Sequence, residues 1–272
     1  MKNIFMMFII LALLFSSGFA RAESGASPVE ISAAKSLEWN RKDKTYTARE
    51  KVVVIQGAAR IHSDMLIARY TDDQGMTEIS TLEAGGNVII QSPPYTAYGD
   101  HAVYNVKTGN AVMTGKAMKV ATEADVVTAQ DKIEFFSAEG RLVATGKATA
   151  IHGTSALMAD VLGAYFGASA GGKMEIRKIT ATGNAVIETA RETITGDAGV
   201  YDIPTQKAVL TGKVMIRQGK NWLEGTSANV DMATGISQLL GGGNADTEGR
   251  VRGVFYPDAV QQKNGEPLEI GP

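Results

Sequence analysis

The stretch GDHAVYNVKTGNAVMTGK occupies residues 99–116, and a second version of it, GDAGVYDIPTQKAVLTGK, occupies residues 196–213. The two stretches lie 97 residues apart, and extending their alignment back to Glu78 gives 17 identical pairs in 39 positions. Agreement of this extent indicates an internal repeat, which is typical of proteins built from copies of one supersecondary unit. We place the two copies at about residues 76–140 and 173–235.

Short runs of β-branched residues make up much of the chain around these stretches. Examples are EKVVVIQG at residues 50–57, NVIIQS at 87–92 and VMIRQG at 214–219. Such runs, bounded by Gly, Asn, Thr or Pro, are typical of strands, and no helical period stands out after the first 22 residues. The sequence therefore predicts an all-β fold, and the uneven spacing of its units favours an antiparallel meander over a strict β-helix.

Five aspartates open alternating stretches at intervals of 29 to 37 residues, and in three cases an aromatic residue follows four positions later. The aspartates are Asp64, Asp100, Asp131, Asp160 and Asp197, and the aromatic residues are Tyr104, Phe135 and Tyr201. A calcium-binding repeat would need the G-G-x-G-x-D nonapeptide, which is absent. We interpret the aspartates as residues that form corners of the chain.

Alternate residues of a strand face opposite sides, so the position of each corner predicts which side chains point inward. If Gly99 and Asp100 form a corner and the strand begins at His101, Tyr104 faces inward and Val103 faces outward. The inward set then contains Ala102, Tyr104 and Val106 in the first copy, Gly199, Tyr201 and Ile203 in the second, and Val88 and Ile90 on the preceding strand. It contains no charged residue, as expected of either a packed core or an apolar binding surface.

The first residues have the order of a secretory signal peptide. Lys2 precedes an apolar run, and Ala20-Arg21-Ala22 supplies a cleavage pattern, which predicts removal of residues 1–22. The net charge of −2 becomes −4 after this removal, which gives no electrostatic reason to expect a nucleic acid partner. The chain has no cysteine, so it must fold without disulfides, and residues 257–272 are expected to form a flexible tail.

The sequence offers little for catalysis or metal binding. Residues 167–171 match G-x-S-x-G, but neither a following helix nor a later histidine accompanies them. His62, His101 and His152 lack neighbours at metal-ligand spacing, and the Ile-His pairs at 61–62 and 151–152 look like copies of one strand position. We therefore expect no enzyme activity, no cofactor and no metal.

Four segments together resemble the OstA-like family, which includes the periplasmic bridge protein of lipopolysaccharide transport. They are PVEISAAKSLEW (28–39), EKVVVIQGAARIHSDMLIARY (50–70), GDHAVYNVKTGNAVMTG (99–115) and RVRGVFYP (250–257). The resemblance implies that residues 23–256 form an open, elongated antiparallel β-jelly roll with an apolar trough. It also implies a location in the periplasm, where the acyl chains of lipopolysaccharide bind in the trough.

The implied partners are lipopolysaccharide, an inner-membrane transport subunit, an outer-membrane translocon and further copies of the chain arranged head to tail. The duplication leaves open whether the chain forms one extended jelly roll or two fused ones. The trough residues expected to contact lipid are Val29, Ile31, Val88, Ile90, Tyr104, Val106, Ile187, Tyr201, Ile203, Val214 and Ile216.

Two other functions remain open from the sequence. The chain could be the membrane-anchored subunit of the same pathway, if its first apolar segment is not cleaved. It could instead be a polysaccharide-active β-repeat enzyme that uses the spaced aspartates.

Overall fold

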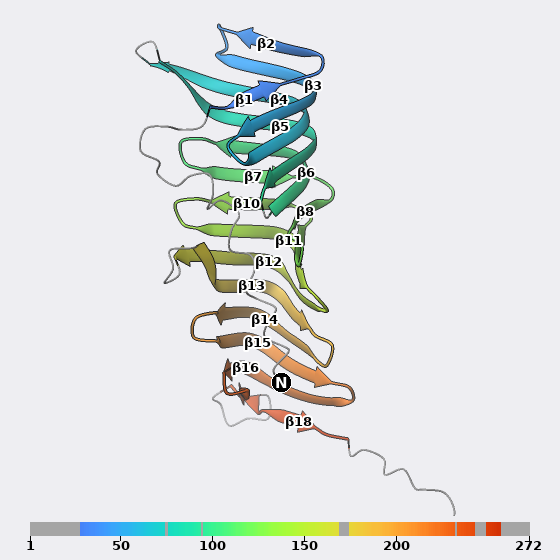
Figure 1. The fold of residues 1–272 in the computed structure, drawn as a ribbon. Coiled ribbons are helices and arrows are strands. Elements are labelled where there is room, and N and C mark those ends of the chain that lie inside the picture. The colour runs from blue at the N-terminus through green and yellow to red at the C-terminus, as the bar shows by residue number, and fades with distance from the viewer. Residues whose placement is uncertain are drawn as a thin grey trace, which may run out of the picture.

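The computed structural model describes residues 28–73, 76–93, 95–168, 174–231, 233–242 and 249–256. They form an elongated stack of strands that runs from β2 at one end to β18 at the other (Figure 1). The strand pairings are antiparallel and the described residues contain no α-helix, so the predicted all-β class is confirmed. The predicted signal peptide at 1–22 and the predicted tail at 257–272 lie outside the described residues.

Eighteen strands make up the described fold. They are β1 Glu30–Ser32, β2 Ser36–Asn40, β3 Thr45–Gln56, β4 Ala59–Asp73, β5 Met76–Ser92, β6 Tyr95–Asn105, β7 Asn110–Thr114, β8 Met118–Ala121, β9 Asp125–Ala129, β10 Lys132–Phe136, β11 Arg141–His152, β12 Ser155–Ala168, β13 Met174–Glu188, β14 Thr193–Asp202, β15 Lys207–Gln218, β16 Asn221–Asp231, β17 Ile236–Leu240 and β18 Arg252–Val254. Hydrogen bonding links all of them into one sheet, so the duplicated chain is one extended structure.

The sheet bends along its length into two layers. The long strands β3–β6 and β11–β16 run through both layers, whereas the short strands belong to one. The first layer also contains β2, β7, β10 and β17, and the second layer also contains β1, β8, β9 and β18. For example, β6 pairs with β7 through residues 101–105 and with β8 through residues 96–98. This two-layered, open arrangement is a β-jelly roll.

The bend is produced by a bulge that recurs on alternate strands. In β5, Gly86 and Asn87 together oppose the single residue Asp100 of β6. Both bulge residues have positive φ, 76° for Gly86 and 46° for Asn87, which glycine and asparagine adopt more readily than other residues. A bulge of this kind bends its strand, so repetition of the bulge folds the whole sheet along one line.

Four of the five spaced aspartates lie on the strands between the bulges, and Asp131 lies in the bend between β9 and β10. A β-carbon on the facing bulge glycine would collide with each of them, so only glycine fits. The facing pairs are Asp64 with Gly86, Asp100 with Gly115, Asp131 with Gly146, Asp160 with Gly183, and Asp197 with Gly212. Because all five are exposed residues of the corner, the interpretation of these aspartates as corner residues is confirmed.

One detail of that interpretation is wrong. The strand containing the first quoted stretch begins at Tyr95 and runs through Asp100, rather than beginning at His101. The reason is that Asp100 occupies the bend of a continuous strand, so residues on both sides of it belong to the sheet. The inward parity after the bend is unaffected, and Ala102 is buried at 8% exposure.

The core beside the corner alternates large and small side chains from strand to strand. Leu66, at 1% exposure, lies between Ala48 and Ala84 in the cross-strand pairing. Ala144, at 0% exposure, conversely lies between the larger Ile133 and Leu162. Alternation of this kind lets the two layers interdigitate close to the bend.

Candidate functional site

An unbroken row of uncharged side chains crosses the inner face of the first layer, and we call it the first-layer row. Each member is the direct cross-strand neighbour of the next. The row consists of Trp39, Tyr46, Ala68, Leu82, Tyr104, Ala111, Phe135, Leu142, Ala164, Ile179, Tyr201, Ala208 and Val230. Tyr104, Phe135 and Tyr201 enter it because they follow a corner aspartate by four positions, which keeps them on the inner face.

A matching row, the second-layer row, crosses the inner face of the second layer. It is also formed by direct cross-strand neighbours and is entirely aliphatic. Its members are Ile31, Val54, Ile61, Ile90, Ala97, Val120, Val127, Ala150, Leu157, Ile187, Ile194, Ile216 and Leu223. The two rows form the walls of a groove between the layers.

The larger cavity in this groove lies toward the N-terminal end and is partly open to solvent. The empty space between its lining residues, including space open to solvent, is about 1330 Å³. Members of both rows line it, including Ile61 and Ile90 from the second layer and Tyr104 and Phe135 from the first. Its lining is dominated by aliphatic and aromatic side chains, so the cavity can accommodate apolar chains without satisfying many polar groups.

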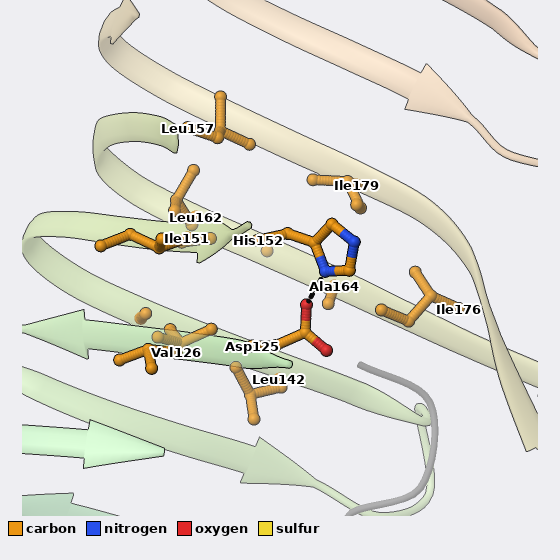
Figure 2. A pocket seen from close by; sticks show the side chains of 14 residues that line it. Asp125, Val126, Leu142, Ile151, His152, Leu157, Leu162, Ala164, Ile176 and Ile179 are labelled. Atoms are coloured by element: carbon orange, nitrogen blue, oxygen red, sulfur yellow. Dashed lines mark hydrogen bonds and ion pairs between the residues drawn. The ribbon is translucent and has the colours of Figure 1, made fainter. Parts of the chain in front are cut away.

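A smaller cavity continues the groove at β9 and β11–β13, and the empty space between its lining residues, including space open to solvent, is about 590 Å³. Leu142 lines both cavities, so they adjoin. Figure 2 shows that Asp125 and His152 come from the second layer, while Ile176 and Ile179 lie opposite them on the first. Within the described part of the chain, Asp125 is the only carboxylate or cationic group that is buried, at 8% exposure.

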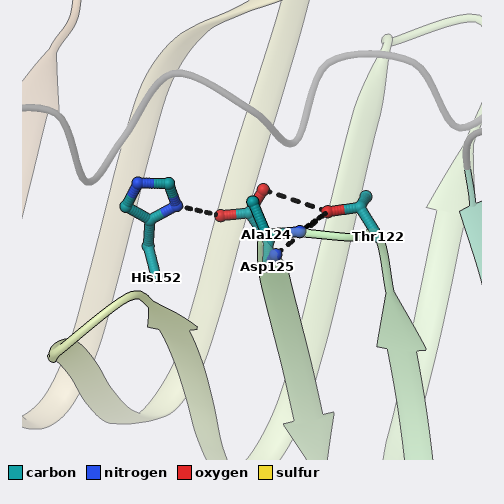
Figure 3. A network of polar contacts seen from close by, with 4 residues as sticks. All are labelled: Thr122, Ala124, Asp125 and His152. Atoms are coloured by element: carbon teal, nitrogen blue, oxygen red, sulfur yellow. Dashed lines mark hydrogen bonds and ion pairs between the residues drawn. The ribbon is translucent and has the colours of Figure 1, made fainter.

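Asp125 is held by hydrogen bonds on both of its carboxylate oxygens (Figure 3). Its Oδ1 lies 2.6 Å from His152 Nδ1, and its Oδ2 accepts a 3.2 Å hydrogen bond from Thr122 Oγ1. Thr122 Oγ1 in turn accepts hydrogen bonds from the backbone N–H groups of Ala124 and Asp125. The turn between β8 and β9 therefore fixes the position of the carboxylate, and the carboxylate orients the imidazole.

The structure places most of the predicted trough residues in or beside the groove. Ile31, Ile90, Ile187 and Ile216 belong to the second-layer row, and Tyr104 and Tyr201 belong to the first-layer row. Val29 precedes β1 and lines the larger cavity.

The other four predicted trough residues belong to neither row. Val88 and Val214 are 1% and 0% exposed, so they pack in the core beside the corner and do not line the cavities. Val106 and Ile203 lie just beyond the ends of β6 and β14, where their backbone N–H groups still bond the carbonyls of Ser80 and Arg177 on the neighbouring strands. Ile203 also packs against the cluster of Ala164 and Ile176. Both residues follow the strands because Asn105 and Asp202 each accept turn hydrogen bonds that end the regular pairing.

Sequence reasoning missed groove residues on strands that lack the pattern of a corner aspartate followed by an aromatic residue. Ile61 and Leu82 lie on β4 and β5, where no aromatic residue follows a corner aspartate by four positions. The Thr122–Asp125 turn recurs as Thr189–Glu192, in which Thr189 Oγ1 accepts the same backbone hydrogen bonds. That T-x-x-D/E pattern could have pointed to Asp125.

The suggested equivalence of His62 and His152 is wrong. His62 lies in the middle of a strand beside Ile61, whose neighbours form the inner row. His152 is the last residue of β11, pairs with Ser155, and lines the smaller cavity itself. The two histidines therefore have opposite parity relative to the corner, because Ile61 but not Ile151 belongs to the second-layer row.

Burial changes the acidity of the two tyrosines that the repeat places in the first-layer row. Desolvation raises the pKa of Tyr104 above its ordinary value of 10.0. Desolvation, with a smaller effect of the Asp202 charge, raises the pKa of Tyr201 to about 12. Both side chains are therefore neutral at physiological pH, in keeping with the uncharged character of the groove.

Among the described residues, no group of three or more histidine, aspartate or glutamate side chains is arranged to hold a metal ion. No helix in the same residues is long and apolar enough to cross a membrane. Ser169, the serine of the G-x-S-x-G match, lies outside the described residues.

Comparison with known proteins identifies the family. The family described as "LptA/(LptD N-terminal domain) LPS transport protein" matches residues 30–141 and again residues 127–236. These two matches cover well over half of the chain, so the protein belongs to this family, which is also the OstA-like family that the sequence resembles. The family consists of transport proteins rather than enzymes, and transport of lipopolysaccharide is its shared function.

One curated relative is an uncharacterized protein of Rhizobium meliloti (strain 1021), which is 27% identical over 129 residues. The alignment covers 46% of this chain and 69% of the relative. A similar solved structure is LptH, the LptA homologous periplasmic component of the lipopolysaccharide transport device from Pseudomonas aeruginosa. It is 19% identical with a TM-score of 0.41, and the match covers 49% of this chain and 95% of LptH.

Proposed function

We propose that this protein is a periplasmic carrier that holds the acyl chains of lipopolysaccharide in its groove while the sugars remain in water. The observation that carries the proposal is the pair of uncharged rows facing each other across the groove. At about 4.8 Å between neighbouring strands, the first-layer row extends over roughly 60 Å. A groove of this length shields several acyl chains at once, and each buried methylene contributes about 0.8 kcal/mol.

The chemistry of the lining suits a cargo that moves rather than one that is held at a single point. Apart from the Asp125–His152 pair, the cavity linings consist mostly of aliphatic and aromatic residues, with few polar groups such as Gln56 and Ser92. Dispersion and hydrophobic contacts are non-directional, so an acyl chain can slide along such a surface without breaking specific hydrogen bonds. The protein would then act as a conduit and not as an enzyme.

The two ends of the stack support assembly into a bridge. Within the described residues, β1 and β2 pair only with β3, and β17 and β18 pair only with β16, so both ends leave backbone groups available for another strand. Large apolar side chains are exposed at these ends, including Trp39 at 51% and Phe255 at 69%. Pairing of one end with the opposite end of a second copy is a heterologous contact, which builds an open filament. The same ends would receive the inner-membrane subunit and the outer-membrane translocon.

The alternative of a polysaccharide-active enzyme has little support in the geometry. The aspartates that suggested it form the corner: Asn87 and Asn184 donate side-chain hydrogen bonds to Asp64 and Asp160, and Lys116 donates its backbone N–H to Asp100. The alternative of a membrane-anchored subunit depends on residues 1–22. Sequencing the N-terminus of the exported protein decides it, since an intact Met1 would favour the anchor.

Photo-crosslinking in cells tests the proposed carrier directly. A photoreactive residue at Tyr201, which faces the groove, should capture lipopolysaccharide, whereas one at Val200 should not. Val200 is the matched control because it is adjacent, 45% exposed and on the opposite face. Val103 is a poorer control, since it borders the larger cavity. Equal capture at Tyr201 and Val200 would rule out the groove as the lipid path.

A further inference from the structure

The Asp125–His152 pair interrupts an otherwise apolar cavity, and the carrier function alone does not explain it. Burial of an ionisable pair costs free energy unless the pair has a structural or binding role. The turn at Thr122 would be complete without the histidine, because its backbone hydrogen bonds go to Thr122 Oγ1. The turn therefore does not explain the presence of the imidazole, which must have a separate role.

The hydrogen bonds of the pair leave one ring nitrogen uncommitted. Both carboxylate oxygens of Asp125 and the Nδ1 atom of His152 are engaged with each other or with Thr122. The Nε2 atom makes no hydrogen bond to another residue in the described part of the chain, and Figure 2 shows it pointing away from Asp125. Around it, the cavity wall is aliphatic, with Ile176 and Ile179 on the opposite layer.

The position of the pair defines the kind of ligand group it can reach. His152 and Asp125 lie at the ends of β11 and β9, at the margin of the second layer and one alternating position beyond Ala150 and Val127 of the second-layer row. A ligand whose acyl chain lies along that row would bring its polar end, and not its tail, to this margin.

We infer that His152 Nε2 binds a hydroxyl group on the acyl chain of the ligand, close to the chain's polar end. Because Asp125 holds Nδ1, Nε2 is an acceptor when the ring is neutral and a donor when the ring is protonated. A hydroxyl group can donate to the first form and accept from the second, so it is the group that fits in either state. This inference rests on the proposed binding of acyl chains in the groove and adds a preference for hydroxylated chains.

Nitrogen NMR of the imidazole rings tests the inference, because the chain has three histidines. The probes are methyl 3-hydroxytetradecanoate and methyl tetradecanoate, which differ only in the hydroxyl group. The Nε2 resonance of His152 should shift with the hydroxylated ester and not with the plain ester. His62 and His101 are internal controls, since neither lines the described cavities and His101 is engaged with Glu83 at 3.2 Å.

Competition of the two esters against a bound fluorescent fatty acid measures the difference between their affinities for the groove. One added hydrogen bond corresponds to about a fivefold preference for the hydroxylated ester. The double variant Asp125→Asn/His152→Phe removes Nε2 without leaving an unpaired carboxylate, and it should lose the preference, so that the two esters compete equally well. Tyr104→Phe, which removes a hydroxyl from the larger cavity, should retain the preference.

The outcomes separate this inference from the proposed function. If groove methyl resonances such as those of Ile187 move with both esters but His152 responds to neither or to both alike, the hydroxyl site is refuted and the carrier function stands. If neither ester moves the groove resonances, both are refuted. The NMR comparison uses the native chain, so it decides the matter even if the double variant fails to fold.

Discussion

The side-chain amide of Asn87 donates a 2.7 Å hydrogen bond to Oδ2 of Asp64 on the adjacent strand. The second copy repeats the relationship, in which Asn184 donates a 2.9 Å bond to Asp160. In both copies the glycine before the asparagine has a φ of 76°. The bend that creates the groove is therefore specified by a local contact, and each copy of the repeat carries it independently.

The corner should be sensitive to a single added methyl group. Gly183→Ala places a β-carbon against Asp160 at positive φ, so we expect the free energy of unfolding to fall by about 3 kcal/mol. Gly153→Ala is the matched control, because Gly153 has a φ of 55° but no atom within 4 Å of the added carbon. It should cost only about 1 kcal/mol, from backbone strain. Urea denaturation measures both, and equal losses would show that the contact with Asp160 is unimportant.

A charge in the second-layer row should block the groove. Ile90→Asp puts a carboxylate beside the larger cavity, where an acyl chain would have to desolvate it, so the lipopolysaccharide that copurifies with the protein should fall at least tenfold. Gln91→Asp, one residue along and exposed, should bind as the native protein does. Quantifying bound lipid after purification distinguishes the two variants. Similar losses in both would mean that the effect is not specific to the groove.

The buried tyrosine predicts a loss of stability in alkali. Because the pKa of Tyr201 rises from 10.0 in the unfolded chain to about 12 in the folded one, the unfolded chain ionises first as the pH increases. The contribution of Tyr201 to stability is complete below pH 10, and it declines as the pH rises through about 12. The difference in free energy of unfolding between native protein and Tyr201→Phe should change in that interval. A difference that stays constant from pH 9 to 12 would contradict the burial argument.

End-to-end association should depend on the last strand. Deleting residues 250–272 removes β18 and the exposed Phe255 but leaves the paired strands up to β17, so the protein should remain folded and become monomeric. Deleting only residues 257–272 should preserve concentration-dependent oligomers without a fixed size, as an open heterologous contact requires. Light scattering over a wide concentration range measures both. A closed dimer, or polymers formed by the shorter protein, would refute the edge-to-edge arrangement.

The sequence predicted the strands and the corners because both have local signals. The alternation of β-branched residues marked the strands, and the spaced aspartates such as Asp100 and Asp197 marked the bends. The same parity rule placed Tyr104 and Tyr201 on the inner face. The rule could not distinguish residues that line the groove from residues that pack in the core beside the corner. This difference depends on the distance between the two layers at each position. Val88 and Val214 have the correct parity but lie too close to the bend.

The Asp125–His152 pair could not be predicted in the same way. The two residues are 27 positions apart, and they meet because β9, which pairs with β8 on one side, pairs with the end of β11 on the other. The short segment between β6 and β11 divides into four strands, of which β7 and β10 belong to the first layer and β8 and β9 to the second. Nothing in its local pattern reveals which of these strands joins which layer.

Strands that carry a corner aspartate alternate with strands that carry a bulge, and this alternation limits how such a protein can change in length during evolution. A strand with an aspartate must sit beside a strand with two positive-φ residues, so insertion of one strand would bring two bulges together, or two carboxylates. Growth is therefore possible only in whole strand pairs, each adding about 9.6 Å to the stack. The length of one copy can thus change only in steps of one strand pair. A given distance must be spanned by changing the number of strand pairs or the number of copies joined end to end. In this chain Thr226 of β16 occupies the corner position that an aspartate occupies on the earlier strands, and its hydroxyl donates to the carbonyl of Leu240. The aspartate series therefore ends one strand pair before the free end of the stack.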